Sequence, residues 1–493
     1  MGGTIYSKRT LFLGTVTSSH PTEQPGPLLS IEWLAILALF SVSILGSFVG
    51  AGSLIRFLFP VGSLAVALFL YQRSPILYLG FNWWIAFLAP FMRRLADYYR
   101  GSFDSSSIML TAPYLVTFVA GITMLRELPY SQRRGNLPFL LAAVGVCYSL
   151  LVGLVRGNGS ATVIRTLLDW LPPLLLAYHT SANWRLYPQM ASNAKRVFSW
   201  AALVLGGYGV YQYLIAPDWD SFWLIAVDMV SFGRPEPMGI RVWSTLNGPP
   251  PFACVMGIAL LVLFIEDSLL KIPAAAVGYL SFLLSLVRSA WLGWMVGLLT
   301  LITALRSGAQ LKLFTTIIVM ALCVMPLTAI EPFSEVIGDR VESLTAGGND
   351  SSAEDRSATY RENFGIALSS LSGRGLGGTW RVNEVGRLER VALDSGILEM
   401  FFTLGWIGAI PYLGSLLLLM YSLFSDHAVQ GDPFLAVCRA ATLSIFSILA
   451  LGPFMLGTSG MAMWGFLGLG IAGRKYYQAE SMSTQSQDAE SDI

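Results

Sequence analysis

The chain has 493 residues, of which 54% are hydrophobic and 12% are charged, and its mean hydropathy is +0.60. This composition lies outside the range of soluble domains and predicts a helical membrane protein. The formal net charge of +1 says nothing about nucleic acid, but the sequence has no basic stripe that would bind it, so we expect no nucleic-acid partner.

Apolar windows of roughly 18–20 residues give about fourteen candidate membrane spans. We expect residues 1–28 to form a polar cytoplasmic tail, 29–475 to form a single all-α bundle of about 12–14 transmembrane helices, and 476–493 to form a disordered cytoplasmic tail. In chain order the spans lie at 31–50, 54–71, 75–92, 108–125, 137–155, 162–179, 197–215, 248–265, 272–287, 288–305, 312–330, 400–424, 433–451 and 455–473.

Lysine and arginine set the expected orientation, because short cytoplasmic segments are enriched in them. Both termini are predicted to be cytoplasmic, which leaves two outer loops at about 216–247 and 331–393. One segment disagrees: "RRLADYYRG" (93–101) would face outward with three arginines. Either the helix count near 54–92 is wrong, which we favour, or these arginines act at the outer face. The cytoplasmic charges would be Lys8, Arg9, Arg126, Arg133, Arg134, Arg185, Lys195, Arg196, Arg306, Lys312, Arg474 and Lys475.

The larger outer loop contains a predicted helix, "SSAEDRSATYRENFGIALSSLSGRG", capped by Ser351 or Ser352 and ended by Gly373. Arginines surround it, and a solvated charged loop is the ordinary interpretation. Arg288 is different, because it lies in the apolar stretch "LLSLVRSAWLGWMVGLL". Near the bilayer centre an arginine costs roughly 2.5–3.5 kcal/mol, so it is either paired in a polar cavity or simply ends a span. The loop arginines are Arg356, Arg361, Arg374, Arg381, Arg387 and Arg390.

Four stretches resemble segments of the O-antigen ligase and oligosaccharide-unit polymerase superfamily of bacterial envelopes. They are "GIRVWSTLNGPPPFACVMGIALL" (239–261), "SLVRSAWLGWMVGLL" (285–299), "DRSATYRENFGIALSSLSGRGLGG" (355–378) and "DSGILEMFFTLGWIG" (394–408), in the family's order. The last one fits the ligase signature of histidine, a small polar residue, nine residues and Gly-x-x-Gly, with Gly405 and Gly408 in register. However, Asp394 stands where the ligases have histidine, and none of the three histidines lies in this loop.

The resemblance implies a metal-independent glycosyltransferase that needs no cofactor. Its donor would be an oligosaccharide on polyprenyl pyrophosphate at the outer face of the cytoplasmic membrane, and its acceptor a glycan. The departure at Asp394 favours a polymerase of repeat units over the alternative, a ligase that moves a finished glycan to a lipid or protein. A chain-length regulator or a flippase would be a further partner. A transporter of solutes or lipid-linked sugars, the alternative from another class, would not explain the large outer loop.

The same resemblance assigns roles to residues. Arginine forms bidentate contacts with phosphate, so Arg241 and Arg288 are expected to hold the pyrophosphate. Asp394 would accept the proton of the attacking hydroxyl; the alternative is that it only caps the following helix. Further substrate contacts would come from Arg356, Arg361, Arg374, Tyr360, Asn247 and Ser395.

Weaker features have ordinary explanations. The pair Asp218 and Asp220 in "DWD" mimics a metal-binding Asp-x-Asp, but a chance loop pair is favoured. Glu32 and Asp169 lie in apolar segments, where we expect them to be buried and paired. Some tryptophans could stack on sugar rings, although interfacial anchoring is their usual role; these are Trp219, Trp223, Trp243 and Trp380.

Overall fold

The computed structural model describes residues 30–131, 135–304, 388–391, 393–425 and 431–491, together with most of 308–318 and 364–382. Its helices are α1 (Ile31–Phe48), α2 (Gly52–Arg73), α3 (Pro75–Arg100), α4 (Ala112–Phe118), α5 (Gly121–Glu127), α6 (Leu137–Val155), α7 (Ser160–Ala182), α8 (Tyr187–Ile215), α9 (Asp218–Val227), α10 (Pro249–Leu263), α11 (Lys271–Leu284), α12 (Arg288–Ala304), α16 (Gly396–Phe424), α17 (Pro433–Ser447) and α18 (Gly457–Ser491). Short 3₁₀ turns lie at Ile108–Thr111, Leu128–Tyr130, Trp184–Leu186, Val230–Phe232 and Leu449–Leu451. Strands β1 (Trp380–Val382) and β2 (Leu388–Arg390) form an antiparallel hairpin.

The described part of the chain contains seven helical segments that are long and apolar enough to cross a membrane. Leucines and valines on the outside of α1 and α2 are exposed, which suits contact with lipid. The chain is therefore an all-α, multi-pass membrane protein, and the predicted fold class is confirmed. The seven segments are Ile31–Phe48, Gly52–Arg73, Pro75–Arg100, Ile108–Tyr130, Leu137–Val155, Gly396–Phe424 and Pro433–Leu451.

The helices clarify two uncertain regions of the sequence. Helices α2 and α3 match the expected spans at 54–71 and 75–92, so a miscount there does not explain the arginines of 93–101. These arginines belong to the last turns of α3. The predicted break between 272–287 and 288–305 is present, because α11 ends at Leu284 and α12 begins at Arg288. The expected span at 312–330 and the first part of the second outer loop, 331–363, lie largely outside the described residues.

The C-terminal end differs from the expectation of a disordered tail at 476–493. Helix α18 continues from the bundle to Ser491. After Gly473 the sequence has no glycine or proline, and alanine, glutamate, glutamine, lysine and methionine are good helix formers. The helix therefore has no local reason to stop where the membrane span ends.

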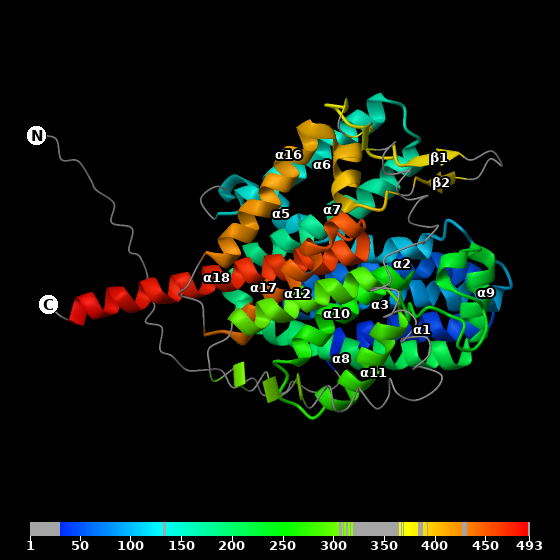
Figure 1. Ribbon diagram of the computed structural model, residues 1–493, viewed down its shortest axis with the longest axis horizontal. Helices are drawn as coiled ribbons and strands as arrows, with labels where there is room; N and C mark the ends of the chain where they lie inside the picture. The colour runs from blue at the N-terminus through cyan, green and yellow to red at the C-terminus, as the bar shows by residue number, and fades with distance from the viewer. Residues whose placement is uncertain are drawn as a thin grey trace, which may run out of the picture.

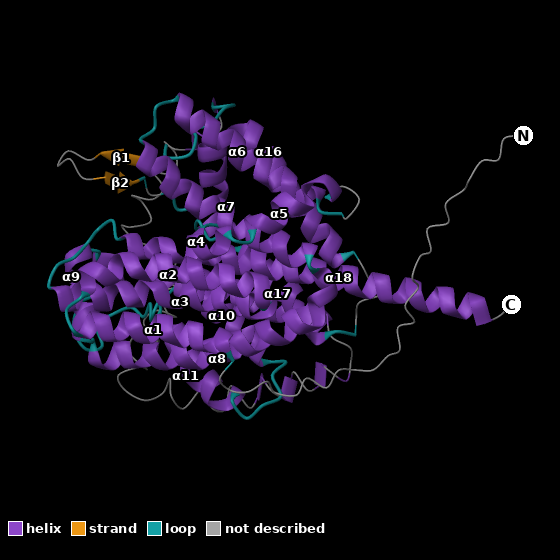
Figure 2. Ribbon diagram, turned by 180° about the vertical axis from the view of Figure 1, so that it is seen from behind, coloured by secondary structure: helices purple, strands orange, loops and turns teal. Residues whose placement is uncertain are grey.

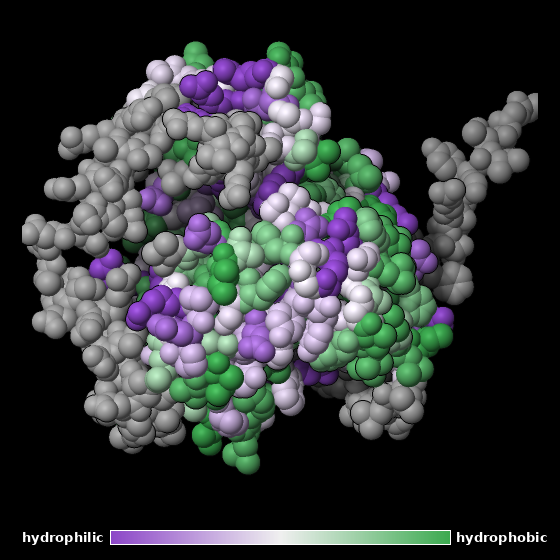
Figure 3. All heavy atoms as spheres, turned by 90° about the vertical axis from the view of Figure 1, so that its right-hand side faces the viewer, coloured by the Kyte–Doolittle hydropathy of each residue, from purple (hydrophilic) through white to green (hydrophobic). Residues whose placement is uncertain are grey.

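The two ends of the bundle carry different elements. In Figure 1 the bundle lies roughly horizontally, with α9 and the β1–β2 hairpin at the right and α18 leaving it at the left. Figure 2 shows the same arrangement from behind. We call the end with α9 and the hairpin the hairpin end. Figure 3 looks onto it and shows hydrophilic residues on this face, with hydrophobic residues towards its flank. Both outer loops predicted from the sequence contribute to this end.

Small residues allow the helices to pack closely. Gly145 of α6 faces Gly408 of α16, where an added Cβ on Gly145 would lie 2.4 Å from the carbonyl oxygen of Gly408. Such contacts let two helix backbones approach each other in a membrane, where packing replaces the hydrophobic driving force. Gly408 belongs to the Gly-x-x-Gly motif, so its role is to hold α16 against α6.

Candidate functional site

The glycine turn at 373–377 fits into a break in α16. Gly373, Gly375 and Gly377 have φ values of 69°, 75° and 84°, in the left-handed region that favours glycine. The backbone N–H groups of Arg374 and Gly375 donate to the carbonyls of Phe402 and Thr403, at 2.8 and 3.0 Å. These carbonyls are free for this contact because α16 is kinked at Gly405, where φ is 63° and ψ is 179°. Two of the sequence motifs therefore form one structural unit.

The α6–α7 turn holds the glycine turn from its other side. The amide of Asn158 donates to the carbonyls of Arg374 and Leu376, at 3.0 and 2.8 Å. The hairpin follows directly, and the guanidinium of Arg165 lies 4.4 Å from the ring centroid of Trp380 in β1. Trp380 is thus engaged in a cation–π contact within the protein.

Asp394 and Ser395 lie at the start of α16 in different environments. Ser395 is the N-cap: its backbone is extended, with φ −144° and ψ 123°, and its buried Oγ accepts a hydrogen bond from the N–H of Leu398 at 3.3 Å. The alternative role of Asp394 as the cap is therefore wrong, because the residue next to it fills that position. Asp394 is exposed.

Charged side chains from three separate segments meet next to this helix start. We call Tyr114, Arg165, Asp169, Arg390 and Glu399 the Arg390 cluster. Arg390 of β2 donates to Glu399 of α16, with Nη2 and Oε1 2.5 Å apart. The hydroxyl of Tyr114 donates to Asp169 of α7 at 3.2 Å, and the charges of Arg390 and Arg165 also act on Asp169. Two arginines thus balance two carboxylates.

The two side chains of the Arg390–Glu399 ion pair are buried to different extents. The side chain of Glu399 is 2% exposed and that of Arg390 is 36% exposed. Burial lowers the pKa of Arg390, but the negative charges of Glu399 and Asp169 outweigh this effect and raise it, so the guanidinium stays protonated. The sequence analysis did not identify Glu399. The sequence feature that could have identified it is a single carboxylate in the otherwise apolar run "GILEMFFTLG".

Arg241 and Arg288 both lie at the turn between α11 and α12. Arg241 donates from Nη1 to the carbonyl of Ser231 at 2.7 Å, and from Nε and Nη2 to those of Ser285 and Leu286, both at 3.2 Å. Leu286 has a positive φ of 55°, and Arg288 begins α12 two residues later. Arg288 is therefore at a helix end and half-buried, rather than in the middle of a span.

The other expected site residues have varied environments. Arg374 is exposed within the glycine turn, and Asn247 is exposed just before α10. Arg356, Tyr360 and Arg361 lie outside the described residues. Of the expectation that Glu32 and Asp169 are buried and paired, only the pairing is confirmed: Glu32 lies 3.8 Å from Arg73, and Asp169 bonds to Tyr114. Both Glu32 and Asp169 are only partly buried.

A buried ion pair fixes the loop that contains Arg241. Arg94 of α3 and Asp220 of α9 are both 0% exposed, with Nε and Oδ1 2.6 Å apart. Arg94 also donates to the carbonyls of Ser244 and Leu246, at 2.5 and 2.6 Å. Asp220 accepts from Gln212 at 2.7 Å, so its carboxylate has a structural role rather than a free face for metal.

The neighbouring aromatic and charged residues serve the same structure. Trp223 and Trp243 are buried, which removes them as sugar-stacking platforms. Arg93 pairs with Asp97 at 2.8 Å, and Arg100 with the same carboxylate at 3.0 Å. The arginines of 93–101 are therefore engaged in ion pairs at the end of α3.

No family model matches the chain, and no curated protein is similar enough in sequence to count as a relative.

Proposed function

We propose that the chain is a membrane glycosyltransferase that polymerises oligosaccharide units carried on polyprenyl pyrophosphate. The observation that carries the proposal is the packing of the glycine turn into the kink of α16, which joins two of the motifs on which the resemblance rests. That packing presents an exposed Asp394 five residues before the buried Glu399, next to the Arg390 cluster. The hairpin end would face the outer side of the cytoplasmic membrane, with both termini inside.

The proposed reaction is a displacement at the anomeric carbon of the donor sugar. An acceptor hydroxyl oxygen forms the new glycosidic bond, the bond to pyrophosphate breaks, and pyrophosphate leaves on its lipid. The acceptor proton passes to the carboxylate of Asp394, which acts as general base. Because Asp394 is exposed and Ser395 caps the helix, a substrate hydroxyl could approach the carboxylate without disturbing α16.

Arginines would neutralise the leaving pyrophosphate. Arg288, at the first turn of α12, is the first candidate, because the helix N-terminus adds a favourable partial charge. Arg241 donates to three backbone carbonyls around the turn before Arg288, so we assign it the positioning of that turn as well as support for the pyrophosphate. Arg374, exposed on the glycine turn, would contact the glycan or its phosphate.

The direct test uses the purified protein in liposomes with a synthetic polyprenyl-pyrophosphate oligosaccharide. A ladder of longer glycans on the same lipid is the expected result. Transfer of a single unit to a different lipid or protein acceptor would instead support a ligase. Movement of intact donor across the bilayer, with no new glycosidic bond, would contradict an enzyme and support transport.

A further inference from the structure

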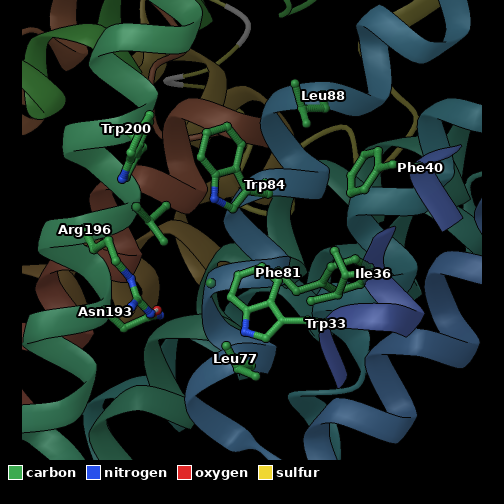
Figure 4. Close-up of a pocket in the computed structure, with 12 residues that line it drawn as sticks. Trp33, Ile36, Phe40, Leu77, Phe81, Trp84, Leu88, Asn193, Arg196 and Trp200 are labelled. Atoms are coloured by element: carbon green, nitrogen blue, oxygen red, sulfur yellow. Dashed lines mark hydrogen bonds between the residues drawn. The ribbon is translucent and has the colours of Figure 1, made fainter. Parts of the chain in front are cut away.

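A second candidate binding site, which shares no residue with the Arg390 cluster, lies between α1, α3 and α8. It is a cavity of about 400 Å³. Figure 4 shows its walls: Trp33 and Phe40 come from α1, Leu77 and Trp84 from α3, and Trp200 from α8. Trp33 and Trp200 are exposed, so the cavity opens at the side of the bundle, where a membrane protein meets lipid.

The lining is apolar apart from one polar corner on α8. Arg196 donates from Nη2 to Oδ1 of Asn193 at 3.4 Å, and Nδ2 of Asn193 donates to the carbonyl of Ile76 at 3.1 Å. Asn193 is buried and Arg196 is exposed, as Figure 4 places them at the edge of the apolar walls. The corner thus carries the positive charge of Arg196, and its neighbour Asn193 is held in a fixed orientation by the bond to Ile76.

This corner is level with the start of α3, a candidate membrane span, because Asn193 bonds to Ile76, and it is on the side of the C-terminus. Tyr187, at the start of α8, packs on Tyr476 and Tyr477 of α18, with ring centroids 6.1 and 6.0 Å apart. Arg196 is the last charged residue before the apolar part of α8, 197–215. A guanidinium at this level meets the phosphate region of a bilayer.

The depth of the cavity fits one leaflet. The lining residues of α3 run from Leu77 to Leu88, which is ~16 Å along a helix at ~1.5 Å per residue. Half of a hydrocarbon core of ~30 Å is ~15 Å. The cavity therefore reaches from the headgroup level to about the middle of the membrane, the length of one acyl chain.

We propose that this cavity binds one anionic phospholipid of the leaflet on the C-terminal side. One acyl chain lies between α1 and α3, against Trp33, Phe40 and Trp84, and the phosphate contacts Arg196 beside Asn193. The site is separate from the Arg390 cluster and does not depend on the proposed transferase activity. Its bound lipid would fill the cavity between α1, α3 and α8.

Native mass spectrometry of the full chain released from detergent tests the proposal, with phosphatidylglycerol and phosphatidylcholine added separately. Phosphatidylglycerol should be retained with a stoichiometry of one and phosphatidylcholine more weakly. Arg196→Gln should weaken phosphatidylglycerol binding about tenfold, the value of a charge-assisted contact. Arg185→Gln is the matched control: Arg185 is an exposed arginine near the same end that lies over the ring of Trp184, and its loss should change nothing.

Two further experiments test whether a whole lipid, rather than a free phosphate, occupies the cavity. Leu77→Trp places a larger side chain in the cavity and should reduce retention of both lipids. Glycerol phosphate, which has the phosphate without acyl chains, should not compete. Equal retention of the two lipids, or equal losses in Arg196→Gln and Arg185→Gln, would overturn the proposal, as would full retention by Leu77→Trp or effective competition by glycerol phosphate.

Discussion

The pair between Arg94 and Asp220 gives the sharpest stability prediction. Asp220→Asn keeps the size of the side chain but removes the charge that faces Nε of Arg94 at 2.6 Å. Both side chains are 0% exposed, so no water can compensate the remaining guanidinium. Removing one partner of such a pair typically costs about 3–5 kcal/mol. The two carbonyls bound by Arg94 keep part of its hydrogen bonding, which places our expectation at the lower part of that range, about 3 kcal/mol.

A thermal melt of the purified protein in detergent, at one fixed scan rate, measures the effect, since membrane proteins often unfold irreversibly. Glu236→Gln is the matched control. It breaks the pair of Arg234 and Glu236, which are 3.0 Å apart and 81% and 53% exposed. An exposed pair contributes about 0–1 kcal/mol. If Asp220→Asn melts no earlier than Glu236→Gln, the buried pair does not hold α9 against α3.

Three further predictions concern the site and its surroundings. Gly405→Ala should lower stability by at least about 1–3 kcal/mol, because φ is 63° and the new Cβ would lie 2.3 Å from the backbone nitrogen of Gly373; a melt equal to that of wild type would contradict the tight fit. Glu399→Gln should cost about 1–3 kcal/mol, less than a fully buried pair because Arg390 is 36% exposed, and denaturant titration should detect it. Burial raises the pKa of Glu266, but hydrogen bonds from Ser268 and Ser199 outweigh it and lower the pKa below 4.5. The carboxylate of Glu266 therefore stabilises the fold fully at pH values well above its unfolded pKa, and this stabilisation is lost as pH falls through the lower folded pKa. Glu266→Gln should flatten the dependence of the melting temperature on pH on the acid side, and an unchanged slope would refute this.

The membrane helices could be predicted because each is encoded locally by a run of apolar residues. The break before Arg288 was visible for the same reason, as a charge between two apolar stretches. The continuation of α18 to Ser491 was missed, because a polar composition was interpreted as disorder although every residue after Gly473 tolerates a helix.

The polar contacts could not be predicted in the same way. Arg94 and Asp220, or Arg390 and Asp169, lie far apart in the sequence, and only the tertiary packing brings them together. The N-cap of α16 could not be predicted from the sequence either. Asp394 and Ser395 are both good caps by composition, and the choice depends on which residue is extended immediately before the helix.

The most direct test of the central claim is the rate of glycan polymerisation by Asp394→Asn. The variant is close in shape to the wild type and leaves the cap at Ser395 in place, so its expression and melting temperature should not change. Polymer formation with saturating donor should fall by about 10²–10⁴-fold if Asp394 is the base. Asp228→Asn is the matched control: Asp228 is also exposed and acidic, and its φ of 54° is one that asparagine tolerates. Full activity of Asp394→Asn, equal to that of Asp228→Asn, would contradict the account.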